Sequence, residues 1–255
     1  MKQQVNTVIN YLKEQPYMKG CITGSCMLDK YYEGMDIDLF VYDEKSFTNI
    51  LWNLYYNKEY VILENLEGWK FDQFVTKVTG GQASWGVTTI KFLYNTCVPV
   101  NIILKRNCKN IFDVLASFDM DIICKGYDIK TKQTLDLLGD SVATKIASFN
   151  KWNNNFYDPE LWQVSRILRQ LDRCIKYHKR GFNTDAVVLK YIELIDSIQE
   201  YQNIFNSNDF SEKLKIKKRN TKVVKKICEA WLETHEISDK QLELLQDKIK
   251  EITDK

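Results

Sequence analysis

The chain has 255 residues, of which 44% are hydrophobic, and a formal net charge of +2 at neutral pH. So many apolar residues can bury a substantial core, which excludes a disordered chain, and the small net charge does not by itself indicate a nucleic-acid partner. The seven cysteines are scattered without paired spacing and only two histidines accompany them, so neither a disulfide framework nor a zinc site is expected.

The ends and apolar runs of the chain indicate no targeting or membrane segment. The first ten residues are polar, and no apolar run approaches the roughly 20 residues that a membrane-spanning helix needs. We therefore expect a cytoplasmic protein with reduced cysteines and no membrane partner.

The first half of the chain mixes helix and strand patterns. Apolar spacing and turn residues predict, in chain order, a helix over 5–12 ended by Pro16, a strand over 17–23, a turn into a short helix at Gly24 and Ser25, and a strand over 35–42. Further elements are expected at 46–57 (helix), 60–63 (strand), 87–94 and 98–104 (hairpin), 111–117 (helix) and 120–124 (strand). Together they predict an α+β domain over residues 1–150.

Strand patterns disappear after residue 150. Helical apolar spacing runs over 161–179, 185–204, 222–234 and 239–252. We expect an all-helical C-terminal domain over residues 151–255, with the boundary within 149–157, where Lys-Trp-Asn-Asn-Asn interrupts the pattern.

Two carboxylates alternate with apolar residues in the strand expected over 35–42. Side chains two positions apart share one face of a strand, so Asp36 and Asp38 project together, roughly 7 Å apart, while Ile37 and Leu39 enter the core. Adjacent like charges are costly unless a cation neutralises them, and Mg²⁺ prefers oxygen ligands of this kind. We predict that Asp36 and Asp38 are catalytic and hold two Mg²⁺ ions. The plainer alternative is the polar face of an edge strand.

Gly24 and Ser25 precede the carboxylates and suit the same chemistry. A glycine lets the backbone pass close to a phosphate, the N–H groups that follow open a short helix, and the serine hydroxyl adds a donor. We expect both residues to bind a nucleotide, the alternative being an ordinary turn.

Residues 20–41 read Gly-Cys-Ile-Thr-Gly-Ser-Cys-Met-Leu-Asp-Lys-Tyr-Tyr-Glu-Gly-Met-Asp-Ile-Asp-Leu-Phe-Val. This segment resembles the nucleotidyltransferase signature of the DNA polymerase β-like superfamily, nearest to its tRNA nucleotidyltransferase and poly(A) polymerase branch. Asp29 falls where that branch has an acidic residue, whereas Leu28 replaces its arginine. The resemblance implies a mixed sheet with flanking helices in the N-terminal domain. It also implies transfer of a nucleoside monophosphate from a nucleoside triphosphate to a hydroxyl, with an RNA (tRNA-like) 3′ end as acceptor.

The resemblance further implies a third carboxylate on a neighbouring strand. Asn101 lies where that strand is expected and offers only an amide. The segment 117–124 resembles the Arg-Arg-Asp-Phe-Thr-Ile-Asn-Ala motif of the same branch without its arginines and asparagine, so Asp119 or Asp121 can supply the ligand. Asp121 lies between two apolar residues and is our predicted third catalytic metal ligand. A helix cap at Asp119 and a solvated Asp121 are the alternatives.

Basic residues in the second half predict contacts to phosphates. Asp158-Pro159 opens a helix that resembles the arginine-rich neck helix of tRNA nucleotidyltransferases, and its basic residues recur at steps of three and four. Lys145, Arg166 and Arg169 are expected to bind the triphosphate. The residues expected to bind nucleic acid are Arg173, Lys176, Arg180, Lys217, Lys218 and Arg219. A solvated charged face or pairing within the chain is the alternative for each group.

Two other classes of function stay open. The nucleotide can be transferred to a protein, to another nucleotide or to a small molecule. The neutral Asn101 is also compatible with a degenerate transferase that acts as a binding or antitoxin-like module.

Overall fold

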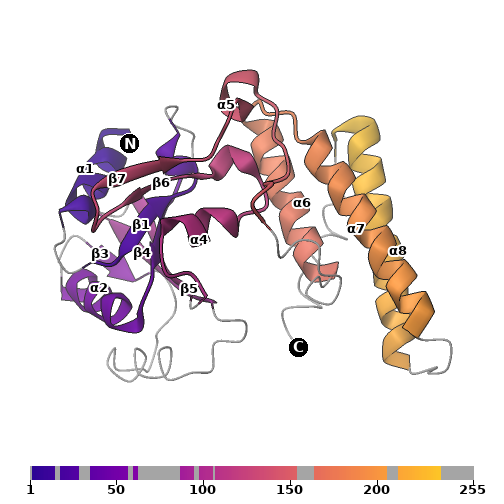
Figure 1. The fold of residues 1–255 in the computed structure, drawn as a ribbon, viewed down its shortest axis with the longest axis horizontal. Helices are drawn as coiled ribbons and strands as arrows, with labels where there is room; N and C mark the ends of the chain where they lie inside the picture. Colours follow the sequence, from indigo (N-terminus) through magenta and orange to yellow (C-terminus); the bar gives the residue numbers. More distant parts are fainter. Residues whose placement is uncertain are drawn as a thin grey trace. The chain divides into compact units, whose positions relative to one another are not determined.

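The computed structural model describes residues 2–14, 18–28, 35–56, 60–62, 87–94, 98–105, 107–153, 164–205 and 212–236 (Figure 1). The helix expected over 239–252 lies outside these residues. The contacts within the chain divide it into two compact units. The first comprises Met1–Phe118 and Ile122–Gly139, and the second comprises Asp119–Asp121 and Asp140–Lys255.

The first unit contains a seven-stranded sheet with the strand order β3-β4-β5-β2-β1-β6-β7. The strands are β1 (Gly20–Thr23), β2 (Ile37–Val41), β3 (Tyr60–Ile62), β4 (Val87–Tyr94), β5 (Val98–Lys105), β6 (Lys125–Asp128) and β7 (Gln133–Asp136). Strands β2 and β5 are parallel and all other neighbours are antiparallel. The prediction of an α+β fold with a mixed sheet is confirmed.

Helices cover both faces of this sheet. The helices α1 (Lys2–Lys13) and α2 (Glu44–Tyr56) bury their apolar stripes in a core that includes Leu12, Phe47 and the sheet residues Ile37 and Leu39. On the other face of the sheet, Phe40 of β2 and Val114 of α4 (Ile111–Ala116) pack in a second, smaller core (Figure 1). Burial of these stripes is what stabilises short helices of ordinary propensity.

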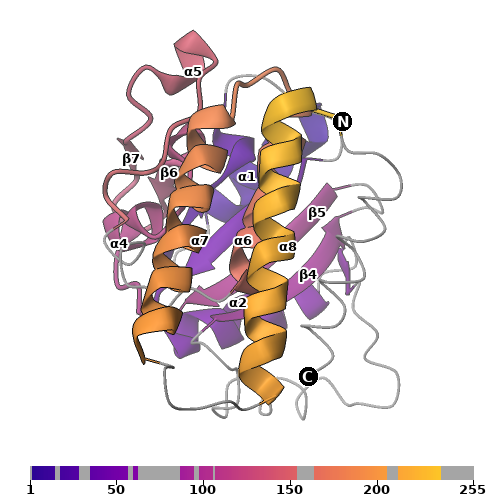
Figure 2. The same cartoon turned by 90° about the vertical axis from the view of Figure 1, so that its right-hand side faces the viewer.

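The second unit is built from helices. They are α5 (Ser141–Thr144), α6 (Val164–Lys179), α7 (Asp185–Phe205) and α8 (Glu212–Thr234). The helices α7 and α8 lie side by side along most of their length (Figure 2), and α6 packs against both. Tyr191 and Trp231 are among the largest fully buried side chains of the chain. The helices expected over 161–179, 185–204 and 222–234 are present as α6, α7 and α8, and α8 begins at Glu212 rather than at residue 222.

The strand expected over 120–124 is wrong. Met120 forms only an isolated bridge with Phe149, and Asp121–Ile123 form one turn of 3₁₀-helix. The reason is a contact between residues distant in sequence, because the Asp121 amide donates to the Ser148 carbonyl at 3.0 Å and the Ser148 amide returns a bond to the Asp121 carboxylate at 2.9 Å.

The chain passes from the first unit to the second at Asp140, earlier than the boundary expected within 149–157. Residues 140–150 belong to the helical unit through backbone hydrogen bonds, from the Asn183 amide to the Lys145 carbonyl at 2.7 Å and from the Asn150 amide to the Asp119 carbonyl at 2.8 Å. The helical unit therefore takes in residues from Asp140 onward. No helix among the described residues is both long and apolar enough to cross a bilayer.

Candidate functional site

The polar residues of the first unit converge where three neighbouring strands lie side by side. Thr23 of β1 pairs with Asp38 of β2, and Asp38 pairs with Asn101 of β5. The side chains of Asp36 and Asp38 are partly exposed, whereas Ile37 between them is fully buried. The alternation along β2 therefore puts both carboxylates on one face of the sheet, as expected for side chains two positions apart.

The amide of Asn101 lies between the two carboxylates. Its Nδ2 atom donates to Asp36 Oδ2 at 2.8 Å and to Asp38 Oδ1 at 2.8 Å. Since one nitrogen contacts both oxygens, these oxygens are less than twice that distance apart. The positive end of the amide dipole thus occupies the place in which a cation would neutralise two like charges.

Gly24 brings the backbone of the turn against Asp38. Its φ of 86° and ψ of −159° belong to a region that is essentially restricted to glycine. A Cβ atom at this position would lie 2.7 Å from Asp38 Oδ2, closer than real Cβ atoms approach other heavy atoms. The turn then continues into a 3₁₀-helix over Ser25–Met27, in which Ser25 is buried. Gly24 is therefore required by its conformation and by its contact with the carboxylate.

We expect Gly24→Ala to displace the Asp38 carboxylate and to reduce divalent-cation binding at this site at least about 10-fold, as loss of ligand positioning does in metal sites. Gly181→Ala is the matched control, because Gly181 has a φ of 87° and nothing within 4 Å of the added Cβ. Titration with Mn²⁺, alongside urea unfolding of both variants, separates the local effect from backbone strain. Equal Mn²⁺ affinity in the two variants would contradict this role of Gly24.

A thiol that was not expected in the site lies next to the carboxylates. The Cys26 Sγ donates to the Thr23 carbonyl at 3.2 Å. Burial, and after it the negative charge of Asp38, raise the pKa of this thiol. Burial likewise raises the pKa of Cys21 and of Cys228 to about 12. Burial thus favours the protonated form of these thiols, and a protonated thiol is a poor nucleophile.

The donor set at Asp36 and Asp38 suits Mg²⁺. This ion is typically held by one or two carboxylates, with the remaining positions taken by substrate phosphates and water. Among the described residues, no three His, Cys, Asp or Glu side chains gather as a metal-binding group. An ion at this place would have two charged ligands within the described residues, and phosphate oxygens are able to complete such a set.

The other two candidate carboxylates have partners of their own in the second unit. Asp119 is 2% exposed, receives a hydrogen bond from the Tyr191 hydroxyl at 2.8 Å, and forms an ion pair with Arg173 at 2.8 Å. The Asp121 carboxylate accepts the Ser148 amide. Asn101 contacts both Asp36 and Asp38, while a role for Asp121 as third metal ligand stays a prediction.

The predicted basic contacts differ in their surroundings. Arg173 is engaged by Asp119 and also donates to Gln170 at 3.1 Å. The Arg180 guanidinium lies over the Tyr177 ring at 5.3 Å, and the Lys145 ammonium lies 4.5 Å from the centre of the Phe182 ring. The side chains that lie outside the described part of the structure are those of Arg166, Arg169, Lys217, Lys218 and Arg219.

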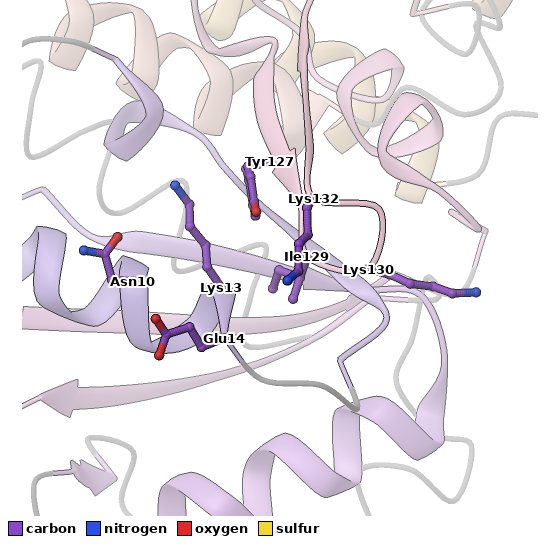
Figure 3. Close-up of a pocket in the computed structure, with 7 residues that line it drawn as sticks. All are labelled: Asn10, Lys13, Glu14, Tyr127, Ile129, Lys130 and Lys132. Atoms are coloured by element: carbon purple, nitrogen blue, oxygen red, sulfur yellow. The ribbon is translucent and has the colours of Figure 1, made fainter.

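A separate pocket of about 520 Å³ is lined by residues at the C-terminal end of α1 and by residues of β6 and the turn after it (Figure 3). Its wall includes Lys13, whose ammonium is 4.3 Å from the centre of the Tyr127 ring, and it is also lined by Lys130 and Lys132. The side chains of Lys13 and Lys130 point away from each other (Figure 3). Tyr127 packs against the core beneath α1, on the sheet face opposite Asp38, so this pocket is not part of the carboxylate site.

Comparison with known protein families, with curated proteins and with solved structures finds no match to this chain. The chemistry of the carboxylate site is therefore the basis for assigning a function.

Proposed function

We propose that the chain is a Mg²⁺-dependent nucleotidyltransferase of the polymerase β-like kind, which moves a nucleoside monophosphate from a nucleoside triphosphate to a hydroxyl and releases pyrophosphate. The observation that carries the proposal is the pair Asp36 and Asp38, side by side on a sheet face and in contact with the glycine turn at Gly24. The order of turn, short helix and carboxylate strand supports it, because phosphoryl transfer needs both a close backbone approach and metal ligands.

The residues of the site have separable tasks in this reaction. Asp36 and Asp38 hold the metal, which when bound neutralises phosphate charge and activates the attacking hydroxyl. Gly24 keeps the space above Asp38 clear of a side chain, so that a phosphate can approach the backbone. Buried Ile37 and Leu39 fix the strand that carries the carboxylates, which limits the reorganisation needed during transfer.

An RNA 3′ end is the proposed acceptor. Lys176 on α6, and Lys222 and Lys226 on α8, are exposed and have no ion-pair partner within the described part of the chain. Such charges suit a phosphate backbone. The neighbouring Lys225 differs, because it pairs with Asp196 at 2.6 Å. The same helix α8 carries Lys217, Lys218 and Arg219, which we include in the proposed RNA contact.

Incubation with α-³²P-labelled nucleoside triphosphates, Mg²⁺ and a mixture of RNA, protein and small hydroxyl compounds tests the function and its acceptor together. We expect label in the RNA fraction, removed by ribonuclease and abolished by EDTA. Label that survives ribonuclease and is removed by protease would replace RNA with a protein acceptor. Label in neither fraction, with no new nucleotide product, would contradict transferase activity.

The neutral Asn101 favours a second candidate, a degenerate transferase that binds a metal–nucleotide complex without transferring it. A third carboxylate would strengthen the hold on the ion that activates the acceptor, and an amide does so only weakly. This candidate requires nucleotide binding that depends on Asp36 and Asp38 but gives no pyrophosphate. Measuring both quantities on one preparation distinguishes the two candidates.

A further inference from the structure

Asn101 occupies the place at which one side chain can reach both carboxylates. The register pairs it with Asp38, and its Nδ2 atom is 2.8 Å from Asp36 and 2.8 Å from Asp38. The flanking Val100 and Ile102 are fully buried, so the backbone of β5 holds the amide in position. The side chain itself is partly exposed, which leaves room for solvent or a ligand beside it.

An asparagine amide offers two chemically opposite ends at nearly one location. The NH₂ group donates hydrogen bonds and interacts well with carboxylates, whereas Oδ1 is a hard oxygen that coordinates Mg²⁺ or Mn²⁺. Rotation about the bond between Cβ and Cγ exchanges the two ends, and this torsion is broad for asparagine. An arriving cation would repel the NH₂ group that now lies between the carboxylates.

We propose that Asn101 is the third, neutral ligand of the metal site, and that its amide turns over when the cation binds. Without metal, the NH₂ group holds Asp36 and Asp38 together and offsets their repulsion. With metal, Oδ1 replaces the NH₂ group and completes a set of two charged ligands and one neutral ligand. The inference rests on the proposed function, because it takes the cation of that reaction as the ligand.

This ligand set has a consequence for the order of binding. Two charges hold a divalent cation less tightly than three would, and the displaced hydrogen bonds add to the cost of filling the site. The phosphates of a nucleoside triphosphate can supply the missing negative charge. The site therefore fills with cation and nucleotide together, and the cation alone binds weakly.

Titration of the full chain with Mn²⁺, followed by electron paramagnetic resonance, tests the role of Asn101 without using activity. Asn101→Leu keeps the side-chain size but has no oxygen, so we expect Mn²⁺ binding about 10-fold weaker than in the wild type. Asn101→Asp adds a third charge and should bind Mn²⁺ at least about 10-fold more tightly. It should also lower the Tm in EDTA, since the carboxylates then repel one another, and Mn²⁺ should restore it.

Asn110→Asp is the matched control. The Nδ2 atom of Asn110 also donates to a carboxylate, that of Asp113 at 3.0 Å, but it does so at the start of α4 rather than between Asp36 and Asp38. This variant adds the same charge and should leave Mn²⁺ affinity unchanged. A change as large as that of Asn101→Asp would mean that net charge alone sets the affinity, and would overturn the inference.

The remaining outcomes separate the inference from the proposed function. If Asn101→Leu binds Mn²⁺ as tightly as the wild type or more tightly, the amide only donates hydrogen bonds to the two carboxylates and does not ligate the metal. The proposed function survives that result. If neither the wild type nor Asn101→Asp binds Mn²⁺, with or without nucleotide, both fail.

Discussion

Asp36→Asn and Asp38→Asn are each expected to lower the rate of nucleotidyl transfer at least about 100-fold, because each removes a charged metal ligand that stabilises the transition state by several kcal/mol. The amide keeps the shape of the carboxylate, and its oxygen can still accept the hydrogen bond from Asn101. The fold should therefore survive. The measurement is kcat for transfer of α-³²P label, with far-ultraviolet circular dichroism as the check on folding.

Asp172→Asn is the control for these variants. Asp172 is an exposed residue of α6, so its substitution makes the same change in charge at the surface of the second unit. It should transfer at the wild-type rate. Retention of more than about a tenth of the wild-type activity in both Asp36→Asn and Asp38→Asn would show that the carboxylates do not hold the catalytic metal.

Arg173→Leu is expected to cost about 3 kcal/mol in the free energy of unfolding, because it leaves the buried carboxylate of Asp119 without its counter-charge. Asp119 is 2% exposed, and its carboxylate contacts the Arg173 guanidinium and the Tyr191 hydroxyl. We take the low end of the range for buried pairs, since the Arg173 side chain is 35% exposed. Urea unfolding followed by circular dichroism measures the loss.

The same network gives two comparisons. Burial, and after it the charge of Asp119, raise the pKa of Tyr191, so its hydroxyl stays protonated and donates. Tyr191→Phe removes one hydrogen bond and should cost about 1–2 kcal/mol. Asp119→Asn combined with Arg173→Leu should be more stable than Arg173→Leu alone, because no unpaired charge remains buried. If the free energy of unfolding of Arg173→Leu lies within about 0.5 kcal/mol of the wild-type value, Arg173 contributes no more to stability than an exposed cation does, and the predicted role is wrong.

The elements with long apolar periodicity could be predicted from the sequence. The amphipathic helix ended by Pro16 appears as α1, and the hairpin expected at 87–94 and 98–104 appears as β4 and β5. These elements bury stripes that local spacing reveals. The short strands β6 and β7 were not predicted. Strand β6 (Lys125–Asp128) contains Gly126, at which a Cβ would lie 3.2 Å from the Ile22 carbonyl oxygen of β1. This strand therefore depends on its close approach to β1, which the local sequence does not indicate.

The candidate site was predictable to the extent that it depends on spacing within one strand. The alternation of Asp36 and Asp38 with apolar residues indicates their common face. The double contact of Asn101 depends on the parallel register between β2 and β5, which no local pattern specifies. For the same reason Arg173 reads as one member of a cationic stripe, whereas the fold pairs it with Asp119, 54 residues away in sequence.

A comparison of α-³²P and γ-³²P nucleoside triphosphates on the wild-type chain tests the central claim most directly. Nucleotidyl transfer breaks the bond between the α and β phosphates, so label from the α position should enter the acceptor and label from the γ position should leave as pyrophosphate. Both results should require Mg²⁺ and should be lost in Asp36→Asn. Label entering the acceptor from the γ position would show a kinase-type transfer and would contradict the account.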